Sequence, residues 1–140
     1  MMIVNLQRKI RLNTRDYQEF VETMSRTLEE IDGREFSIAF VSDRRMKELN
    51  SFFRGKHTTT DVLSFPHESD EFDPDESNLG DIVISVEQAE RQGKENGLTL
   101  ENEIRQLILH GVLHLSGYDH ETDTGQMNKR ELQLRRKLKI

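Results

Sequence analysis

Cysteine is absent from the 140-residue chain. This excludes disulfide bonds and thiolate metal ligands, so histidine is the residue left to hold a zinc-like metal. No apolar run approaches the length needed to cross a bilayer, and the N-terminal residues lack the charged start and long apolar core of a secretory signal. We therefore expect a cytoplasmic protein without a membrane segment. Internal repeats and low-complexity linkers are also missing, and the length predicts one domain over residues 1–140.

The chain also lacks an excess of basic residues. Its formal charge of −6 and pI near 5.4 argue against a protein that coats nucleic acid nonspecifically. The charges are unevenly distributed, however, since residues 68–76 hold six carboxylates and no base, whereas residues 129–139 are strongly basic. A locally basic surface can therefore coexist with a negative total, and the acidic run is typical of a solvated loop.

Apolar periodicity predicts an α+β fold with one mixed four-stranded sheet and about five helices. The third strand meets the fourth through a loop, whereas the second and fourth are each followed by a helix, which makes the sheet mixed. Pro66 predicts an edge position for the third strand. We expect Asp43 and Thr99 to cap helices. The expected strands are 3–7, 35–42, 61–66 and 80–85, and the expected helices are 14–30, 43–54, 86–97, a helix from 99 through 114, and 123–138.

The most informative stretch runs from His110 to His120 and reads His-Gly-Val-Leu-His-Leu-Ser-Gly-Tyr-Asp-His. On a helix, His110 and His114 lie one turn apart on the same face, at chelating distance. Gly117 allows the chain to turn back and bring His120 to the same site. Three histidines with no fourth local ligand are typical of an open, catalytic zinc site, with one ion per chain. Imidazole also suits other divalent metals. The alternative is two partly buried helix residues and a loop residue.

The histidine spacing matches the His-Glu-x-x-His-x-x-Gly-x-x-His motif of the metzincin proteases, except at one position. Gly111 stands where those proteases carry the glutamate that acts as general base. A peptidase of that design would therefore lack its proton acceptor. Three neutral ligands also leave the metal its full double positive charge, which favours an anionic substrate such as a phosphodiester.

The same stretch resembles the signature of the YbeY family of metal-dependent endoribonucleases, the ribosomal RNA maturation factors. Two further stretches agree with that family: Asn50-Ser-Phe-Phe-Arg54 leading into Thr60-Asp-Val-Leu-Ser-Phe-Pro66, and Leu79-Gly-Asp-Ile-Val-Ile84. The resemblance implies the family's fold, with a zincin-like metal helix. It also implies a single-strand-directed endoribonuclease acting in 16S ribosomal RNA 3′-end maturation and ribosome quality control. The implied partners are ribosomal RNA and the ribosome or its small-subunit proteins.

The resemblance also makes Arg54 a functional residue, although an arginine in this sequence context would by itself be an ordinary surface residue. Its guanidinium could hold a scissile phosphate with two hydrogen bonds, and Lys56 could add positive potential. We expect Arg54 and His110 to be catalytic. Asp119 and Glu121 flank the third histidine, and either could orient a ligand imidazole or take a proton from water.

Two other functions stay open at this point. The spacing alone is compatible with a metal-dependent hydrolase of peptides or small molecules, for which Gly111 is the main difficulty. The chain could also be a ribosome-assembly protein that binds RNA or a ribosomal partner while zinc only stabilises its fold.

Overall fold

The computed structural model describes residues 2–72, 76–118 and 123–140 of the chain. In these ranges, no helix has the length and apolar character to span a membrane. The elements in chain order are β1 (Met2–Asn5), α1 (Thr14–Thr27), β2 (Glu35–Val41), α2 (Asp43–Arg54), β3 (Val62–Pro66), β4 (Asn78–Ser85), α3 (Val86–Asn96), α4 (Leu100–Leu115) and α5 (Gln126–Leu138).

The four strands form one sheet in the order β1-β2-β4-β3. β1, β2 and β4 run parallel to one another, and β3 pairs with β4 in the antiparallel direction. The predicted α+β fold with a mixed sheet is therefore confirmed, and β3 is an edge strand as Pro66 indicates. An edge strand leaves one row of backbone hydrogen-bonding groups without a neighbouring strand.

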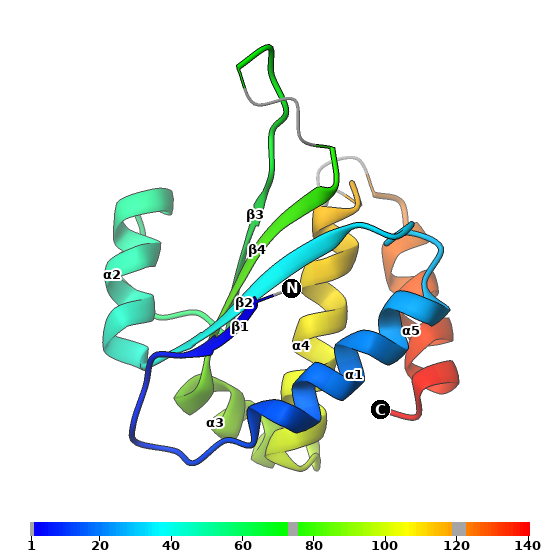
Figure 1. The fold of residues 1–140 in the computed structure, drawn as a ribbon. Coiled ribbons are helices and arrows are strands. Elements are labelled where there is room, and N and C mark those ends of the chain that lie inside the picture. The colour runs from blue at the N-terminus through cyan, green and yellow to red at the C-terminus, as the bar shows by residue number, and fades with distance from the viewer. Residues whose placement is uncertain (1, 73–75, 119–122) are drawn as a thin grey trace.

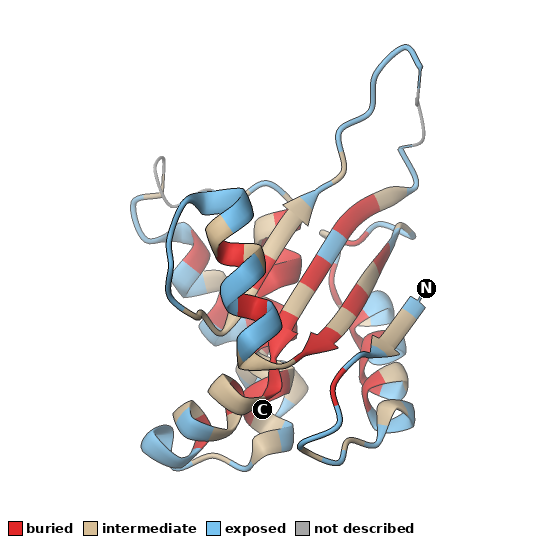
Figure 2. Ribbon diagram, turned by 90° about the vertical axis from the view of Figure 1, so that its left-hand side faces the viewer, coloured by how far each residue is buried: buried red, intermediate tan, exposed pale blue. Residues whose placement is uncertain are grey.

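Helices cover both faces of the sheet (Figure 1), and the strand side chains divide between them. Alternate residues of β2, namely Phe36, Ile38 and Phe40, belong to the large core that α1 and α4 complete. On the opposite face, Met46 of α2 packs with Leu63 of β3 in a smaller cluster. Figure 2 shows the buried residues lying along the strands and on the helix surfaces turned toward them. The sheet is thereby fixed between α4 and α2, the two helices that flank the site described below.

The structure corrects one predicted helix cap. Asp43 was the expected cap of α2, but the Oγ of Ser42 accepts the hydrogen bond from the backbone of Arg45 at 3.2 Å. Asp43 instead accepts a hydrogen bond from the hydroxyl of Ser85 at 2.5 Å, and its carboxylate forms an ion pair with Arg91. Neighbouring residues with equal capping ability cannot be ranked from sequence, because a long-range partner decides which of them caps the helix.

Three elements begin or end two or three residues inside their predicted bounds. β1 ends at Asn5 because the Gln7 amide donates to Asn5 Oδ1 at 2.9 Å and to the carbonyl of Ile10 at 2.7 Å, which closes a turn. α1 ends at Thr27 because Leu28 takes an extended conformation. α5 begins at Gln126 rather than at 123.

Candidate functional site

The site is built on α4, whose ends and packing fix its position. The side chain of Thr99 caps the helix, as predicted, by accepting a hydrogen bond from the backbone of Asn102 at 3.1 Å. The residues Ile104, Ile108 and Val112 are fully buried against the core. This packing anchors one face of α4 in the core. His110 and His114 lie on another face of the helix, where their side chains are only partly buried.

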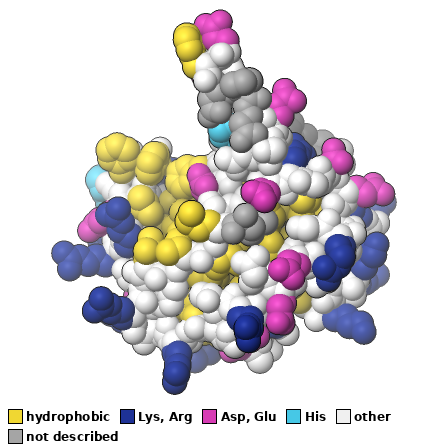
Figure 3. Space-filling view, in the orientation of Figure 1, with side chains coloured by type: hydrophobic (Ala, Val, Ile, Leu, Met, Phe, Trp, Pro, Cys, Tyr) yellow, Lys and Arg dark blue, Asp and Glu magenta, His cyan; other side chains and the backbone are white. Residues whose placement is uncertain are grey.

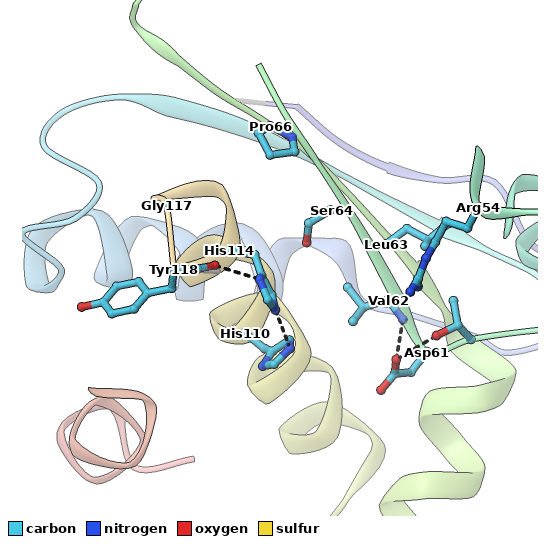
Figure 4. A pocket seen from close by; sticks show the side chains of 11 residues that line it. Arg54, Asp61, Val62, Leu63, Ser64, Pro66, His110, His114, Gly117 and Tyr118 are labelled. Carbon is cyan, nitrogen blue, oxygen red and sulfur yellow. Dashed lines mark hydrogen bonds between the residues drawn. The ribbon is translucent and has the colours of Figure 1, made fainter. Parts of the chain in front are cut away.

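His110 and His114 face each other across one turn of α4, as the sequence predicts. Their Nε2 atoms lie 3.1 Å apart and their ring centroids 4.6 Å apart (Figure 4). Each ring is also held from behind through its Nδ1 atom. The carboxylate of Glu131 on α5 lies 2.9 Å from Nδ1 of His110, and the carbonyl of Tyr118 lies 3.1 Å from Nδ1 of His114.

These contacts determine where the ring protons lie. A carbonyl oxygen only accepts, so Nδ1 of His114 donates to Tyr118. Burial acts to raise the pKa of Glu131, but the hydrogen bond from His110 and the positive charge of Arg135 act against it, and this pKa lies below its ordinary value. Glu131 is therefore an ionised acceptor, and Nδ1 of His110 donates to it. In the neutral rings, both Nε2 atoms then present lone pairs toward the same point.

At 3.1 Å the two Nε2 atoms either share a proton in a hydrogen bond or face a common cation, because two bare lone pairs at this distance would repel each other. Two imidazole nitrogens on one tetrahedral zinc ion stand about 3.3 Å apart, given Zn–N bonds of about 2.0–2.1 Å. The pair therefore has the spacing, tautomer and backing hydrogen bonds that a metal-ligating pair of histidines requires.

The histidine pair opens into a cavity of about 650 Å³. Arg54, at the end of α2, lines the same cavity, and side chains of β3 lie between it and the histidines (Figure 4). Gly55 adopts a left-handed conformation with φ 66° and ends α2 immediately after this arginine. The full lining comprises Arg54, Thr60, Asp61, Val62, Leu63, Ser64, Pro66, His110, His114, Gly117 and Tyr118.

The remaining predicted site residues fall into two groups. Lys56 is exposed and is not among the residues that line the cavity, so its substrate contact stays a prediction. Asp119, His120 and Glu121 lie outside the described residues. Among the residues that are described, no three histidine or carboxylate side chains converge on one point. Gly117 has a φ of +107°, which agrees with the predicted turn after α4.

Glu131 is a site residue that the sequence reasoning missed. It is buried on α5 between Met127 and Leu134, at the spacing of an apolar helix face. A carboxylate among the apolar residues of a helix face is a signal in the sequence that the residue has a buried partner, because a charged group is buried only where it is paired. Its partner His110 lies 21 positions away in the sequence, which no local pattern could identify.

Gly111 faces the sheet rather than the cavity. A Cβ atom at this position would lie 3.0–3.1 Å from side-chain atoms of Ile82 on β4. The position that carries the catalytic glutamate in the metzincin motif is therefore a packing contact between α4 and the sheet. Glycine is the residue that permits this close approach.

Comparisons with known proteins point to one family. A family model described as Endoribonuclease YbeY matches residues 2–139. A protein of Nautilia profundicola named Endoribonuclease YbeY is 41% identical over 128 residues, which cover 91% of this chain and 89% of that protein. One of the same name from Clostridioides difficile is 44% identical over 114 residues, covering 78% and 74%. The solution structure of TM1509 from Thermotoga maritima is similar, with a TM-score of 0.68, 27% identity and coverage of 99% of this chain and 89% of that one.

Proposed function

This chain belongs to the YbeY endoribonuclease family, and we propose that it is a metal-dependent endoribonuclease that cleaves single-stranded RNA. The family match supports the reaction class. The structural observation that carries the assignment is the meeting of two imidazole nitrogens and one guanidinium in a single cavity. This combination fits a substrate whose reacting group is an anionic phosphodiester.

The metal is assigned as one zinc ion per chain, held by His110, His114 and His120. The tautomers of the described pair fit such an ion, because both Nδ1 atoms donate to protein acceptors and both Nε2 atoms point toward one another. When bound, zinc lowers the pKa of a coordinated water to about 7 and polarises a phosphate oxygen. Other divalent metals that accept imidazole ligands would suit the same pair.

Arg54 holds the phosphate in this assignment. Its guanidinium offers parallel N–H groups in the geometry of two phosphate oxygens. No ion pair with a carboxylate is seen for Arg54 among the described residues, so its charge is available to the cavity. Donors that are already in place when charge develops on the phosphate stabilise the transition state.

The residues behind the ligands keep them in position. Glu131 fixes the ring of His110, and the carbonyl of Tyr118 fixes the ring of His114. Either Asp119 or Glu121 is assigned the transfer of a proton to or from water. The edge strand β3 lines the cavity between the histidines and Arg54, so an extended single strand can lie along it.

The biological role is assigned as processing of ribosomal RNA in the cytoplasm, including maturation of the 3′ end of 16S ribosomal RNA, and ribosome quality control. Membership of the YbeY family supports this role. The partners would be ribosomal RNA and the ribosome or proteins of its small subunit.

The test is cleavage of a ribosomal RNA fragment by zinc-loaded protein. We expect His114→Ala and added chelator to abolish cleavage, and Arg54→Ala to lower kcat about 100- to 1,000-fold, the usual cost of losing one transition-state donor. His57→Ala and Arg26→Ala are matched controls. Each removes the same residue type from outside the cavity lining, and Arg26 lies on α1, away from the basic surface of α2, so both should leave the rate unchanged.

The outcome that contradicts the assignment is equal cutting by all preparations, which would identify a contaminating ribonuclease. RNA binding without cleavage would instead favour the ribosome-assembly protein with a structural zinc. The peptide-hydrolase alternative is disfavoured because Gly111 packs against Ile82 and supplies no proton acceptor to the cavity.

A further inference from the structure

Two large aromatic side chains are exposed at the C-terminal end of α2. Phe52 and Phe53 are 82% and 56% exposed. Their rings meet edge to face at 4.9 Å, and Phe53 makes a similar contact with Phe65 of β3 at 5.0 Å. We call these three residues the aromatic face. Scattered single apolar side chains are normal on a protein surface, whereas adjoining ones with a fixed geometry mark an interaction site.

The aromatic contacts hold the rings in place before any partner arrives. Phe65 is partly buried in the cluster that packs α2 on the sheet, so it anchors Phe53, and Phe53 in turn supports Phe52. Each edge-to-face contact covers one face of one ring, and the exposed fractions of 82% for Phe52 and 56% for Phe53 show that ring surface remains open to solvent. A preoriented ring loses little conformational entropy when a second flat group stacks on it.

The surroundings of the aromatic face are positively charged although the whole chain is not. Residues 43–56 contain five basic and two acidic residues, against a total formal charge of −6. Figure 3 shows hydrophobic side chains gathered at the upper end of α2, with Lys and Arg side chains along the helix below them. A partner that contacts both the rings and the cations therefore carries apolar flat groups and negative charge together.

The aromatic face also adjoins the candidate active site. Phe53 directly precedes Arg54, which lines the cavity. Phe65 lies between Ser64 and Pro66, which line the cavity, so its side chain leaves β3 on the opposite face, where α2 packs. Because β3 is the edge strand, a chain that leaves the cavity past the Arg54 guanidinium and passes around this edge reaches the rings.

From this juxtaposition we propose that Phe52 and Phe53 form a stacking platform for the bases of single-stranded RNA. One or two nucleotides stack there next to the phosphate that Arg54 holds. This inference rests on the proposed function and adds the residues that position the strand. Stacking on aromatic rings beside a basic surface is sequence-tolerant, because every base offers a π-face. A duplex is excluded from the platform, since its bases are already stacked within the helix.

The test measures RNA binding rather than cleavage. A fluorescein-labelled single-stranded RNA is titrated with each protein in the presence of chelator, and its anisotropy gives Kd. The variant Phe52→Leu with Phe53→Leu keeps apolar volume but removes the rings, whereas Phe52→Tyr with Phe53→Tyr keeps the rings. Phe72→Leu is the matched control, because Phe72 is 87% exposed but lies in the loop between β3 and β4.

We expect the double leucine variant to bind at least fivefold more weakly, since one lost base stack corresponds to about 5- to 150-fold in Kd. The double tyrosine variant and Phe72→Leu should bind like the unchanged chain. Circular dichroism of each variant verifies the fold. Ultraviolet crosslinking of a 4-thiouridine-labelled strand should modify Phe52 or Phe53 peptides.

Two results would overturn the platform. If the double leucine variant binds as the unchanged chain while Arg54→Ala weakens binding, the rings do not hold RNA and the aromatic face serves another partner, such as a protein. The proposed nuclease function would survive that result. If the unchanged chain binds no single-stranded RNA at all, the platform and the proposed function fail together.

Discussion

The histidine pair depends on hydrogen bonds made on the far side of each ring. The carboxylate of Glu131 and the carbonyl of Tyr118 fix the Nδ1 protons, and the two Nε2 atoms are thereby left as ligands. One of these groups belongs to α5 and the other to the segment after α4. The geometry of the proposed metal site therefore depends on Glu131 and Tyr118, which are not among its assigned ligands.

Replacing Glu131 with glutamine tests this dependence. The amide keeps the shape of the side chain but removes the negative charge, and the hydrogen bond to His110 becomes weaker or reverses. We expect zinc affinity to fall about 10- to 100-fold while the fold is kept. Competition with a chromogenic chelator measures the change.

Glu103→Gln is the control for this experiment. Glu103 is also buried, at 4% exposure, but its carboxylate contacts Asn96 instead of a histidine. Its substitution should leave zinc affinity unchanged. Equal affinity in Glu131→Gln and the unchanged chain would show that the carboxylate does not orient the ligand.

The substitution Gly111→Glu restores the glutamate of the metzincin motif and tests whether the histidine spacing alone can support peptidase activity. Position 111 is buried against Ile82, so a glutamate there would place an unpaired charge in the core. We expect a loss of about 3 kcal/mol or more in the free energy of unfolding, measured by urea denaturation, and no peptidase activity. Gly111→Ala, which adds only a methyl group, should cost less. A stable Gly111→Glu variant that cleaves peptides would contradict this orientation of α4.

At the scale of elements, local patterns were enough to predict the kind of each element. The alternation in β2 and the helical period of α4 come from residues that are neighbours in sequence, and the mixed sheet followed from the order of strands and helices. The edge position of β3 was readable from Pro66. These features require no knowledge of distant contacts.

What could not be predicted depends on partners far apart in the sequence. Ser42 caps α2 because Asp43 is engaged by Ser85, 42 positions away. Glu131 reaches His110 across 21 positions. Residues with the same local propensity are distinguished only by such contacts, so local patterns offer no basis for choosing among them.

The carboxylate of Glu30 links the loop after α1 to α5 and to the segment after α4, and this link depends on pH. Its carboxylate accepts hydrogen bonds from Arg130 of α5 at 2.7 and 2.9 Å. The side-chain hydrogen bond from Arg130 is the largest cause that lowers the pKa of Glu30, and a hydrogen bond from Tyr118 adds to it. The loop between α1 and β2, the helix α5 and the segment that follows α4 are thus linked through the carboxylate of Glu30.

We expect Glu30→Gln to cost about 1 kcal/mol at neutral pH. A carboxyl with a lowered folded-state pKa stabilises fully above its unfolded pKa, about 4.3, and this stabilisation is lost as the pH falls through the lower folded value. The difference between the two proteins should therefore shrink toward zero below that value. Denaturant unfolding at several pH values measures it. Glu29→Gln, an exposed neighbour, should show no such difference, and a difference independent of pH would contradict the ion pair.

At the scale of the whole molecule, the core and the proposed metal site are separate. The main core joins α1, the sheet, α4 and α5, and neither histidine belongs to it. The fold is therefore expected to form from apolar burial without the ion, unlike a small zinc domain that unfolds without metal. Zinc adds stability only by binding the folded state.

Metal removal tests this separation and decides between a catalytic and a structural zinc. We expect the chelated protein to keep its far-ultraviolet circular dichroism at 25 °C and to lose RNA cleavage. A ligand present at about a thousand times its Kd contributes about 4 kcal/mol. For a chain of this size that corresponds to a fall in Tm of roughly 10 °C.

The opposite outcome would have a clear physical meaning. If chelation unfolds the chain at 25 °C, the ion contributes folding energy that the apolar core does not supply, as in a structural site with four protein ligands. If chelation leaves both Tm and cleavage unchanged, the histidine pair holds no functional metal. An open catalytic site on α4 requires a third result: the chelated protein stays folded, loses RNA cleavage, and regains it when zinc is restored. In such a site the ion contributes more to the reaction than to the stability of the fold.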